Sequence, residues 1–272
     1  MLPYYEDNVS VALPKHSDTL TSGTRIQLCG RLRVDLDGRH VTPQLRGRQG
    51  RVLLAYLVLK RRRTVSRDEM IVAVWPEGRP ADPAAALRTQ LSRLRSALGS
   101  EALAGRDTVE LHLPSDSWID VEAADQAKSA TERALAGSDW PEAWSQAHVV
   151  LNIAGRPFLA GFQAPWVDEM RSDLEEMELR ALDAIARAGL RLGGSELAVA
   201  ERSAREVIRR APFRESGYLS LMRTLNAAGN TSEALHIFDQ LRTLLASQLG
   251  SAPGPQLQEL HNRLLRGQGD LD

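Results

Sequence analysis

The sequence predicts a mainly α-helical protein with a small β part near its N-terminal end, in two domains. Three observations predict it. Apolar and polar residues alternate between Ile26 and Val41, as in half-buried strands. Beyond residue 118 this alternation gives way to helical spacing. Residues 25–113 hold 17 Lys and Arg against 9 Asp and Glu, a net charge of +8, whereas residues 114–272 hold 16 against 23, a net charge of −7.

The composition points to a soluble protein of a reducing compartment. Cys29 is the only cysteine, so the 272-residue chain can form no internal disulfide and has no CxxC metal pair. The longest apolar run, Val52 to Leu59, is too short to span a bilayer. The first residues lack both a basic start and an apolar signal core. We therefore expect a cytoplasmic protein with no membrane contact, which begins with a flexible tail over residues 1–24.

The first domain is expected over residues 25–113, in the order sheet, helix, helix, helix, hairpin. Asp37-Gly38 is a strong hairpin-turn signal inside the alternating segment. A mostly buried helix is expected from Arg46 to Lys60. Ser66 and Glu69 form a capping box, so a second helix should run from about Arg67 to Trp75, before Pro76. After the third helix, residues 103–113 resemble a hairpin.

The third helix, Asp82 to Gly99, organises this domain. Asp82 can cap the first turn, Pro83 suits the first helical position, and Gly99 supplies the stop. At about 100° per residue, four leucines share one narrow sector and can pack on a core. They are Leu87, Leu91, Leu94 and Leu98.

The other face of the helix suits the major groove of DNA. It carries short hydroxyl side chains and arginines, namely Arg88, Thr89, Ser92, Arg93, Arg95 and Ser96. Short side chains let a helix approach base edges, and a guanidinium can donate two hydrogen bonds to guanine or phosphate. The alternative is an ordinary amphipathic helix with a solvated arginine face.

Other basic residues of this domain are candidates for contact with DNA phosphates. Arg46, Arg48 and Arg51 crowd the expected start of the first helix, where the helix dipole disfavours cations unless an anion is present. Arg48 is expected to position the backbone rather than read bases. Arg106, in the hairpin after the third helix, completes the set.

This order of elements is that of a winged helix preceded by an N-terminal sheet. The segments LRVDLDGRHVT, RGRQGRVLLAYLVLKRRRTVSRDEMIVAVWP and PAAALRTQLSRLRSALG resemble the OmpR-like DNA-binding domain of the Streptomyces antibiotic regulatory protein family. The wing departs from the family, with Thr108-Val109-Glu110 where a Gly-Tyr is common. The resemblance implies that the third helix enters the major groove, that the sites are promoter direct repeats, and that dimers form side by side on double-stranded DNA.

The second domain is expected over residues 118–267, after a polar linker, as an all-α tetratricopeptide-like domain. At a shift of 34 residues Ala200 matches Ala234, which is the tetratricopeptide period. Trp140-Pro-Glu-Ala143-Trp resembles a third, degenerate copy, separated by an insertion. Within that insertion, GRPFLAGFQAPWVDEMR resembles part of the bacterial transcriptional activation domain of the same family. The resemblance implies the short form of the family, which contacts the RNA polymerase holoenzyme.

No pattern indicates an enzyme. HExxH, GxSxG, GxGxxG and Walker sequences are absent, and neither a cofactor nor a metal is expected. The acidic run between Asp168 and Glu178 is most simply a solvated helix face, or alternatively a docking surface for a basic partner. The tryptophans of the second half are most simply packing residues, although a ligand groove is an alternative; they are Trp118, Trp140, Trp144 and Trp166.

Two functions are consistent with these patterns. The first is a sequence-specific DNA-binding transcriptional activator that controls a biosynthetic gene cluster. The second is a helical-repeat scaffold or ligand sensor, whose winged helix binds protein or nucleic acid without sequence preference. The two differ in whether binding shows base preference above the electrostatic background.

Overall fold

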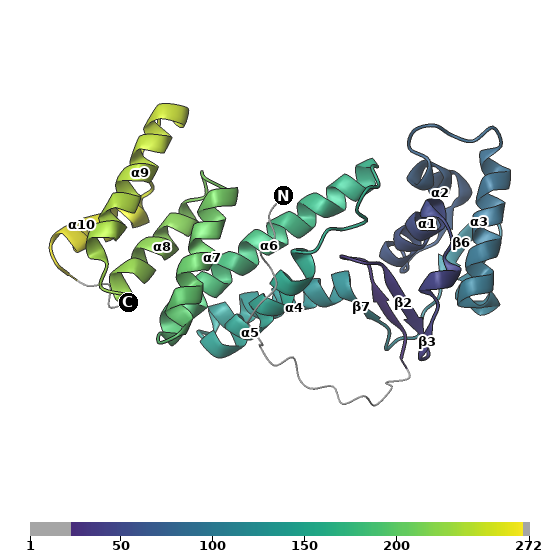
Figure 1. The fold of residues 1–272 in the computed structure, drawn as a ribbon, viewed down its shortest axis with the longest axis horizontal. Coiled ribbons are helices and arrows are strands. Elements are labelled where there is room, and N and C mark those ends of the chain that lie inside the picture. Colours follow the sequence, from purple (N-terminus) through teal and green to yellow (C-terminus); the bar gives the residue numbers. More distant parts are fainter. Residues whose placement is uncertain (1–22, 269–272) are drawn as a thin grey trace.

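The computed structural model describes residues 23–268, and its first sheet joins both ends of the winged helix (Figure 1). Ile26 lies opposite Val34 on one side and opposite Ile119 on the other. The expected tail lies outside the described residues over 1–22, but Thr24 is buried and belongs to the fold. The sheet has the order β3-β2-β1-β7 and is formed by β1 (Arg25–Gln27), β2 (Arg33–Leu36), β3 (Arg39–His40) and β7 (Trp118–Ile119).

The β2–β3 hairpin confirms the turn expected from the sequence. Asp37 has a φ of 46° and Gly38 a φ of 78°. A two-residue hairpin of the type that matches strand twist needs positive φ at both central positions, and Asp-Gly adopts it readily. The fourth strand, β7, was not predicted; it pairs parallel to β1 from beyond the linker.

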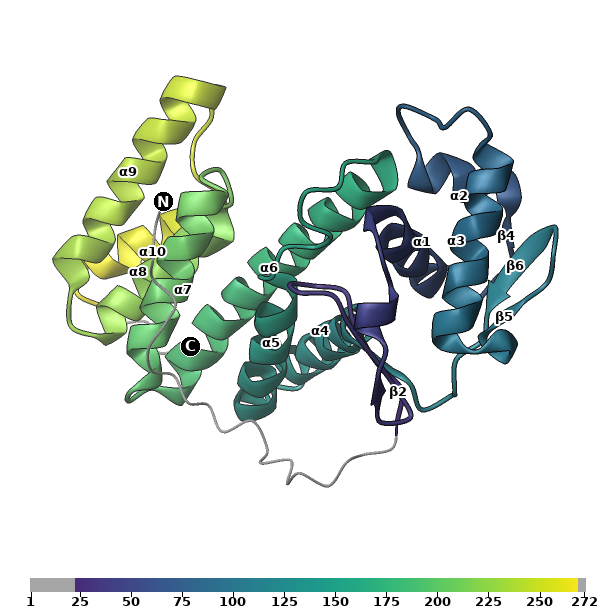
Figure 2. The ribbon, with the colours of Figure 1, turned by 45° about the vertical axis from the view of Figure 1, so that its right-hand side comes forward.

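Three helices and a second sheet complete the winged helix. Helix α3 packs against α1 and α2, and the wing hairpin β5–β6 pairs with β4 in the order β4-β6-β5 (Figure 2). The elements are η1 (Thr42–Gln44), α1 (Arg48–Leu59), β4 (Val65–Ser66), α2 (Arg67–Val74), α3 (Pro83–Leu98), η2 (Ser100–Ala102), β5 (Leu103–Ala104) and β6 (Thr108–Leu111).

Two local expectations need correction. Helix α1 begins at Arg48, so Arg46 lies in the loop before the helix rather than in its first turn. The capping box at α2 is half formed. The Ser66 hydroxyl accepts from the Glu69 amide at 3.2 Å as expected, but the Glu69 carboxylate turns to Arg63 and Tyr56 instead of returning to the Ser66 amide.

The second domain is a series of helices in which each packs against the next. The repeat spacing is confirmed, because Ala143, Ala200 and Ala234 are all fully buried at matching places in α5, α7 and α9. No helix within residues 23–268 is long and apolar enough to cross a membrane. The helices are α4 (Asp120–Ala136), α5 (Trp140–Ala154), α6 (Pro165–Leu192), α7 (Glu196–Arg210), α8 (Glu215–Ala227), α9 (Thr231–Leu249) and α10 (Pro255–Leu265).

The insertion between the first two repeats lies against the winged helix. Its loop, residues 155–164, and the first turns of the 28-residue α6 reach α1 and α2 (Figure 1). The indole of Trp166 donates to the carbonyl of Ala73 in α2 at 3.0 Å and meets the Tyr56 ring edge-on at 5.1 Å. Trp166 is thus a packing residue between domains.

Polar contacts also connect the winged helix to the second domain. The buried Asp120, at the start of α4, accepts hydrogen bonds from the amides of Leu28 at 2.9 Å and Cys29 at 2.8 Å. Burial raises the pKa of Asp120 even though these backbone donors favour its charged form. Arg61, just after α1, binds the Glu122 carboxylate through two hydrogen bonds of 2.7 and 2.6 Å. The winged helix also shares one hydrophobic core with α4, α5 and α6, whereas α6 to α10 enclose a second core.

Candidate nucleic-acid interface

Helix α3 is held at both ends as the sequence predicted. The Asp82 side chain accepts from the Ala85 amide at 2.8 Å, and Gly99 ends the helix with a φ of 102°. The four leucines of the predicted inner face are buried. The position of this helix is therefore set by its cap and its apolar stripe, which leaves the opposite face available to a ligand.

The exposed face of α3 carries five of the ten predicted DNA-contacting residues. Within residues 23–268, the side chains of Arg88 and Arg93 make no hydrogen bond and no ion pair. The Thr89 hydroxyl donates to the Ala85 carbonyl at 3.0 Å, one turn back, so its proton is already used in a hydrogen bond within the helix. The exposed residues are Arg88, Thr89, Ser92, Arg93 and Ser96.

Arg46 lies next to this face and lines a shallow hollow together with residues of α3. Its volume is about 380 Å³, and every lining residue is neutral or cationic: Gln44, Arg46, Ser92, Arg93, Ser96 and Ala97. Two arginines from separate segments thus flank two short hydroxyl side chains. Such a surface can present guanidinium donors to base edges and to a neighbouring phosphate at once.

Arg95 has a different environment from its neighbours on α3. It is half-buried, and its guanidinium donates to the carbonyls of Leu103 at 3.3 Å and Gly105 at 2.9 Å. Gly105 has a φ of 90°, and a Cβ there would lie 2.1 Å from the Thr108 carbonyl oxygen, so the wing turn requires glycine. Arg95 therefore holds the wing against α3.

Arg106 lies exposed in the wing turn, and its backbone carbonyl accepts from the Arg67 side chain at 2.8 Å. Arg67 thereby ties the wing turn to the start of α2. The two anchors, Arg67 and Arg95, place the Arg106 side chain at the edge of the winged helix. A contact between this side chain and DNA remains a prediction.

Arg48 and Arg51 do not share the hollow of Arg46. Arg48 donates to the carbonyl of Gly161 and lies over the Phe162 ring, with its guanidinium carbon 5.0 Å from the ring centroid. Arg51 donates to the Leu45 carbonyl at 3.3 Å. Both line a second hollow of about 540 Å³ between α1 and the insertion loop. Contact of Arg48 or Arg51 with a DNA phosphate remains a prediction. In the structure, the Arg48 side chain instead binds the second domain.

Sequence reasoning missed some polar residues near these arginines. Gln44, in η1, lines the hollow of Arg46, and its place directly before the basic helix start was a usable signal. Arg31 and Arg33 line a further hollow of about 620 Å³ beside Arg51. Arg31 lies between β1 and β2, and Arg33 lies in β2. The alternating pattern of this segment was interpreted through its apolar residues alone, so these two arginines were not predicted as site residues.

A polar network joins α1 and the turn after it to α2. The Arg63 guanidinium binds the Glu69 carboxylate, and this hydrogen bonding holds the pKa of Glu69 down at about 2. The Tyr56 hydroxyl also donates to Glu69. Burial, aided by the neighbouring carboxylate, raises the pKa of Tyr56 to about 12, so that it stays a neutral donor.

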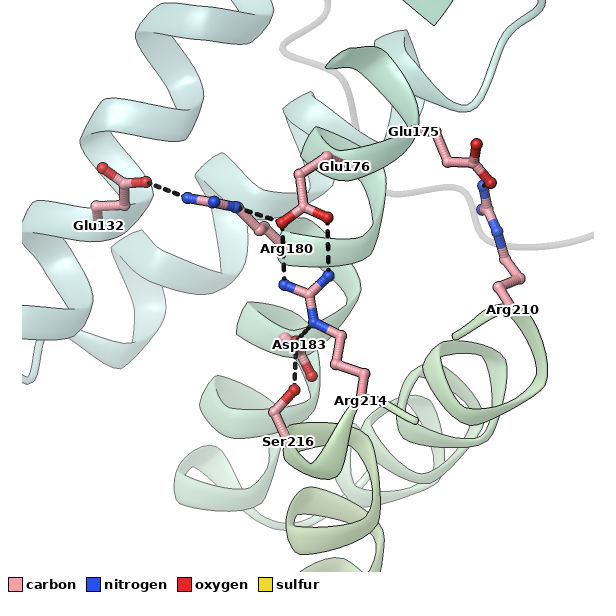
Figure 3. Close-up of polar contacts among 8 residues, drawn as sticks. All are labelled: Glu132, Glu175, Glu176, Arg180, Asp183, Arg210, Arg214 and Ser216. Carbon is pink, nitrogen blue, oxygen red and sulfur yellow. Dashed lines mark hydrogen bonds and ion pairs between the residues drawn. The ribbon is translucent and has the colours of Figure 1, made fainter. Parts of the chain in front are cut away.

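Several carboxylates in the acidic run of α6 form ion pairs within the protein. Glu176 receives hydrogen bonds from Arg180 at 2.8 Å and Arg214 at 3.0 Å (Figure 3). Glu178 pairs with Arg210 at 2.6 Å, and Asp168 pairs with Arg171 at 3.1 Å. The contacts with Arg210 and Arg214 join α6 to the segments that follow it, whereas Arg171 and Arg180 lie in α6 itself. Glu169 and Asp173 of the same run are exposed and make no ion pair within residues 23–268, so a docking surface for a basic partner stays an alternative prediction.

The fold and this surface define a class of protein, an OmpR-like winged helix fused to a tetratricopeptide-like domain. The family described as the bacterial transcriptional activator domain matches residues 119–265. The chain belongs to the Streptomyces antibiotic regulatory protein family of transcriptional regulators, which joins that domain to such a winged helix.

Individual relatives agree with this membership. The chain is similar to the regulatory protein AfsR of Streptomyces griseus, with 33% identity over 223 residues, which are 82% of this chain and 23% of the relative. It is 29% identical over 251 residues to the transcriptional regulatory protein EmbR of Mycobacterium tuberculosis, which covers 89% of this chain and 63% of EmbR. A solved structure of M. tuberculosis EmbR superposes with a TM-score of 0.79 over 92% of this chain and 66% of that chain, at 27% identity. The chain thus spans only part of these relatives.

Proposed function

We propose that this protein is a sequence-specific DNA-binding transcriptional activator, which acts in the cytoplasm on double-stranded promoter DNA. The observation that supports it best is the hollow between α3 and η1, where Arg46 and Arg93 flank Ser92 and Ser96 without a carboxylate among the lining residues. The +8 charge of residues 25–113 supplies the long-range attraction.

Base reading is assigned to the face of α3 and backbone positioning to its neighbours. Arg88, Arg93 and the short hydroxyl side chains face the major groove, and Arg46 and Arg106 contact flanking phosphates. The relatives are named as transcriptional regulators, which supports a role in transcription. By the same family likeness, the protein binds direct repeats as a side-by-side dimer, recruits RNA polymerase holoenzyme, and controls a biosynthetic gene cluster.

A comparison of two arginine variants tests this assignment. Arg93→Ala should cost ~1–3 kcal/mol at the cognate site and relax preference at one or two base positions, because it removes donors from base edges. Arg46→Ala should weaken all duplexes alike and lower the salt slope by about one. The measurement is a binding titration of the full chain against promoter and scrambled duplexes at several salt concentrations.

Arg46 is chosen over Arg48 as the phosphate-contact variant because the Arg48 side chain binds the second domain. Arg202→Ala, on the exposed side of α7, is the matched control and should leave binding unchanged. None of the three changes should alter stability by more than roughly 0.5 kcal/mol. Equal losses on both duplexes for Arg93→Ala would instead favour a scaffold that binds nucleic acid without sequence preference.

A further inference from the structure

The hollow between α1 and the insertion loop is built by both domains. The winged helix contributes residues from 28–32, between β1 and β2, and from 47–52, at the start of α1. The second domain contributes residues 159–162 of the insertion loop. The volume of about 540 Å³ lies within the roughly 300–1,000 Å³ that is typical of small-molecule sites. This space is here called the interdomain hollow.

Three arginines line the interdomain hollow, and no carboxylate is among its lining residues. The Arg31 side chain is exposed and makes no hydrogen bond and no ion pair within the described part of the chain. Arg48 donates to the Gly161 carbonyl, and Arg51 donates to the Leu45 carbonyl. A carbonyl group has no net charge, so these hydrogen bonds leave both guanidinium charges uncompensated. The interdomain hollow therefore favours an anion.

The start of α1 adds to this preference. Gly47 precedes the first turn, and no side chain of the described residues caps the helix there. The amides of a first helical turn and the helix dipole favour negative charge. Arg48 and Arg51 lie in this turn, where the dipole disfavours a cation, and a bound anion removes that conflict.

The interdomain hollow also has an apolar wall. Five side chains from both domains provide it, namely Leu28, Leu32, Val52, Leu159 and Phe162. The guanidinium carbon of Arg48 lies 5.0 Å from the centroid of the Phe162 ring, so charged and apolar surfaces lie side by side. A ligand that fills this space needs an apolar body as well as an anionic group. A DNA backbone fits less well, because it brings no apolar body of this kind.

We propose that the interdomain hollow binds a small phosphate monoester with an apolar body. Three guanidiniums at a helix start suit a doubly charged phosphate better than a singly charged carboxylate. The phosphate binds Arg31 and Arg51, and the apolar body lies against Leu159 and Phe162. Such a ligand contacts both domains and stabilises their junction.

This function is separate from the proposed DNA binding. The interdomain hollow shares no residue with the hollow on the α3 face that contains Arg46 and Arg93. It assigns Arg48 and Arg51 to the phosphate monoester rather than to DNA phosphates. The binding assay therefore contains no DNA, and a failure of the DNA-binding proposal would leave its result unchanged.

The probe is naphthyl phosphate, titrated into the full chain by isothermal titration calorimetry. Naphthol lacks the charge, and inorganic phosphate lacks the apolar body. Each should bind about tenfold more weakly than naphthyl phosphate, because each loses one of the two contacts. Absence of naphthyl phosphate binding would overturn the proposal, and so would equal affinity for naphthyl phosphate and for either of the two partial ligands.

Two variants from different domains locate the site. Arg31→Glu replaces an attraction by a repulsion and should weaken naphthyl phosphate binding about tenfold. Ala160→Glu adds a carboxylate on the insertion-loop side and should also weaken it. Both positions are exposed, so both variants should fold. The matched controls are Arg39→Glu in β3 and Gln163→Glu in the insertion loop, which are exposed, lie outside the hollow and should stay within about twofold of the unchanged protein.

Arg93→Glu separates the interdomain hollow from the basic α3 face, which also attracts anions. It should leave naphthyl phosphate affinity unchanged while it weakens DNA binding. Loss of naphthyl phosphate binding in Arg93→Glu but not in Arg31→Glu would place the ligand on the α3 face and overturn the proposal. Losses in the two controls as large as those in Arg31→Glu and Ala160→Glu would overturn it as well, because net charge alone would then explain them.

Discussion

At the scale of single residues, the structure separates arginines that the sequence grouped together. Arg93 has no partner within the described residues, Arg95 donates to the wing, and Arg48 donates to the insertion loop. All three guanidiniums have the same chemistry, so only their neighbours decide whether each is available to DNA. The predicted DNA-contacting arginines therefore fall into two groups. Some, such as Arg46 and Arg93, have side chains available to DNA, whereas others, such as Arg48 and Arg95, have side chains that stabilise the fold.

Glu69 gives a pH-dependent prediction at this scale. The Arg63 hydrogen bond lowers the pKa of Glu69 from 4.5 to about 2, so its contribution to stability is fully present above pH 4.5 and is lost as the pH falls through about 2. Glu69→Gln should therefore lower the free energy of unfolding at pH 7. The loss should be about 0.5–1 kcal/mol, since Arg63 is half exposed and water screens the pair.

Urea titrations at pH 7, 4 and 2 measure this difference. It should shrink as the pH falls and be smallest at pH 2, where about half of the Glu69 side chains are protonated in the folded state. Asp68→Asn, in the same first turn of α2, controls for the loss of an acid near the helix start. A difference that stayed constant with pH would contradict the role assigned to the carboxylate.

At the scale of elements, the start of α3 shows how far local sequence reasoning holds. Asp82, Pro83 and Gly99 take the places that capping preferences give them, because these interactions involve only neighbouring backbone. The capping box of α2 failed in part for the opposite reason. Arg63 and Tyr56, from outside the helix, offered the Glu69 carboxylate better partners than the Ser66 amide.

The cap of α3 can be tested directly. Asp82→Ala should lower the free energy of unfolding by about 1 kcal/mol, because the Ala85 amide loses its acceptor. Asp82→Asn retains a side-chain oxygen and should cost much less. Urea unfolding of both variants measures the effect, and similar losses in the two would show that charge near the helix dipole matters more than the hydrogen bond.

At the scale of the whole molecule, the two domains are fused rather than tethered. β7 completes the first sheet from beyond the linker, Asp120 binds the amides of Leu28 and Cys29, and Trp166 packs on α1 and α2. A fragment of residues 25–113 lacks all three contacts, so it should be less stable than the same segment in the full chain.

Trp166→Ala tests the coupling between domains. It should lower the free energy of unfolding by about 3 kcal/mol and speed amide exchange in α2, whose Ala73 carbonyl loses its donor. Trp140→Ala, at the start of α5, is the matched control and should not change exchange in α2. Unchanged α2 protection in Trp166→Ala would show that the winged helix is stable without this contact.

The sequence by itself determined the features that depend on local interactions and on periodicity. These are the Asp37-Gly38 hairpin, the two faces of α3, and the 34-residue repeat that places Ala200 and Ala234 alike. These features depend on the backbone preferences of neighbouring residues and on the spacing of apolar residues, and both can be read directly from the sequence. Only the tertiary structure decided that β7 joins the first sheet, that Arg48 belongs to the interface between domains, and that Arg95 binds the wing. These features depend on contacts between residues that are far apart in the sequence. The local sequence pattern does not show which arginine side chain will lie next to a carboxylate or a carbonyl group in the folded protein.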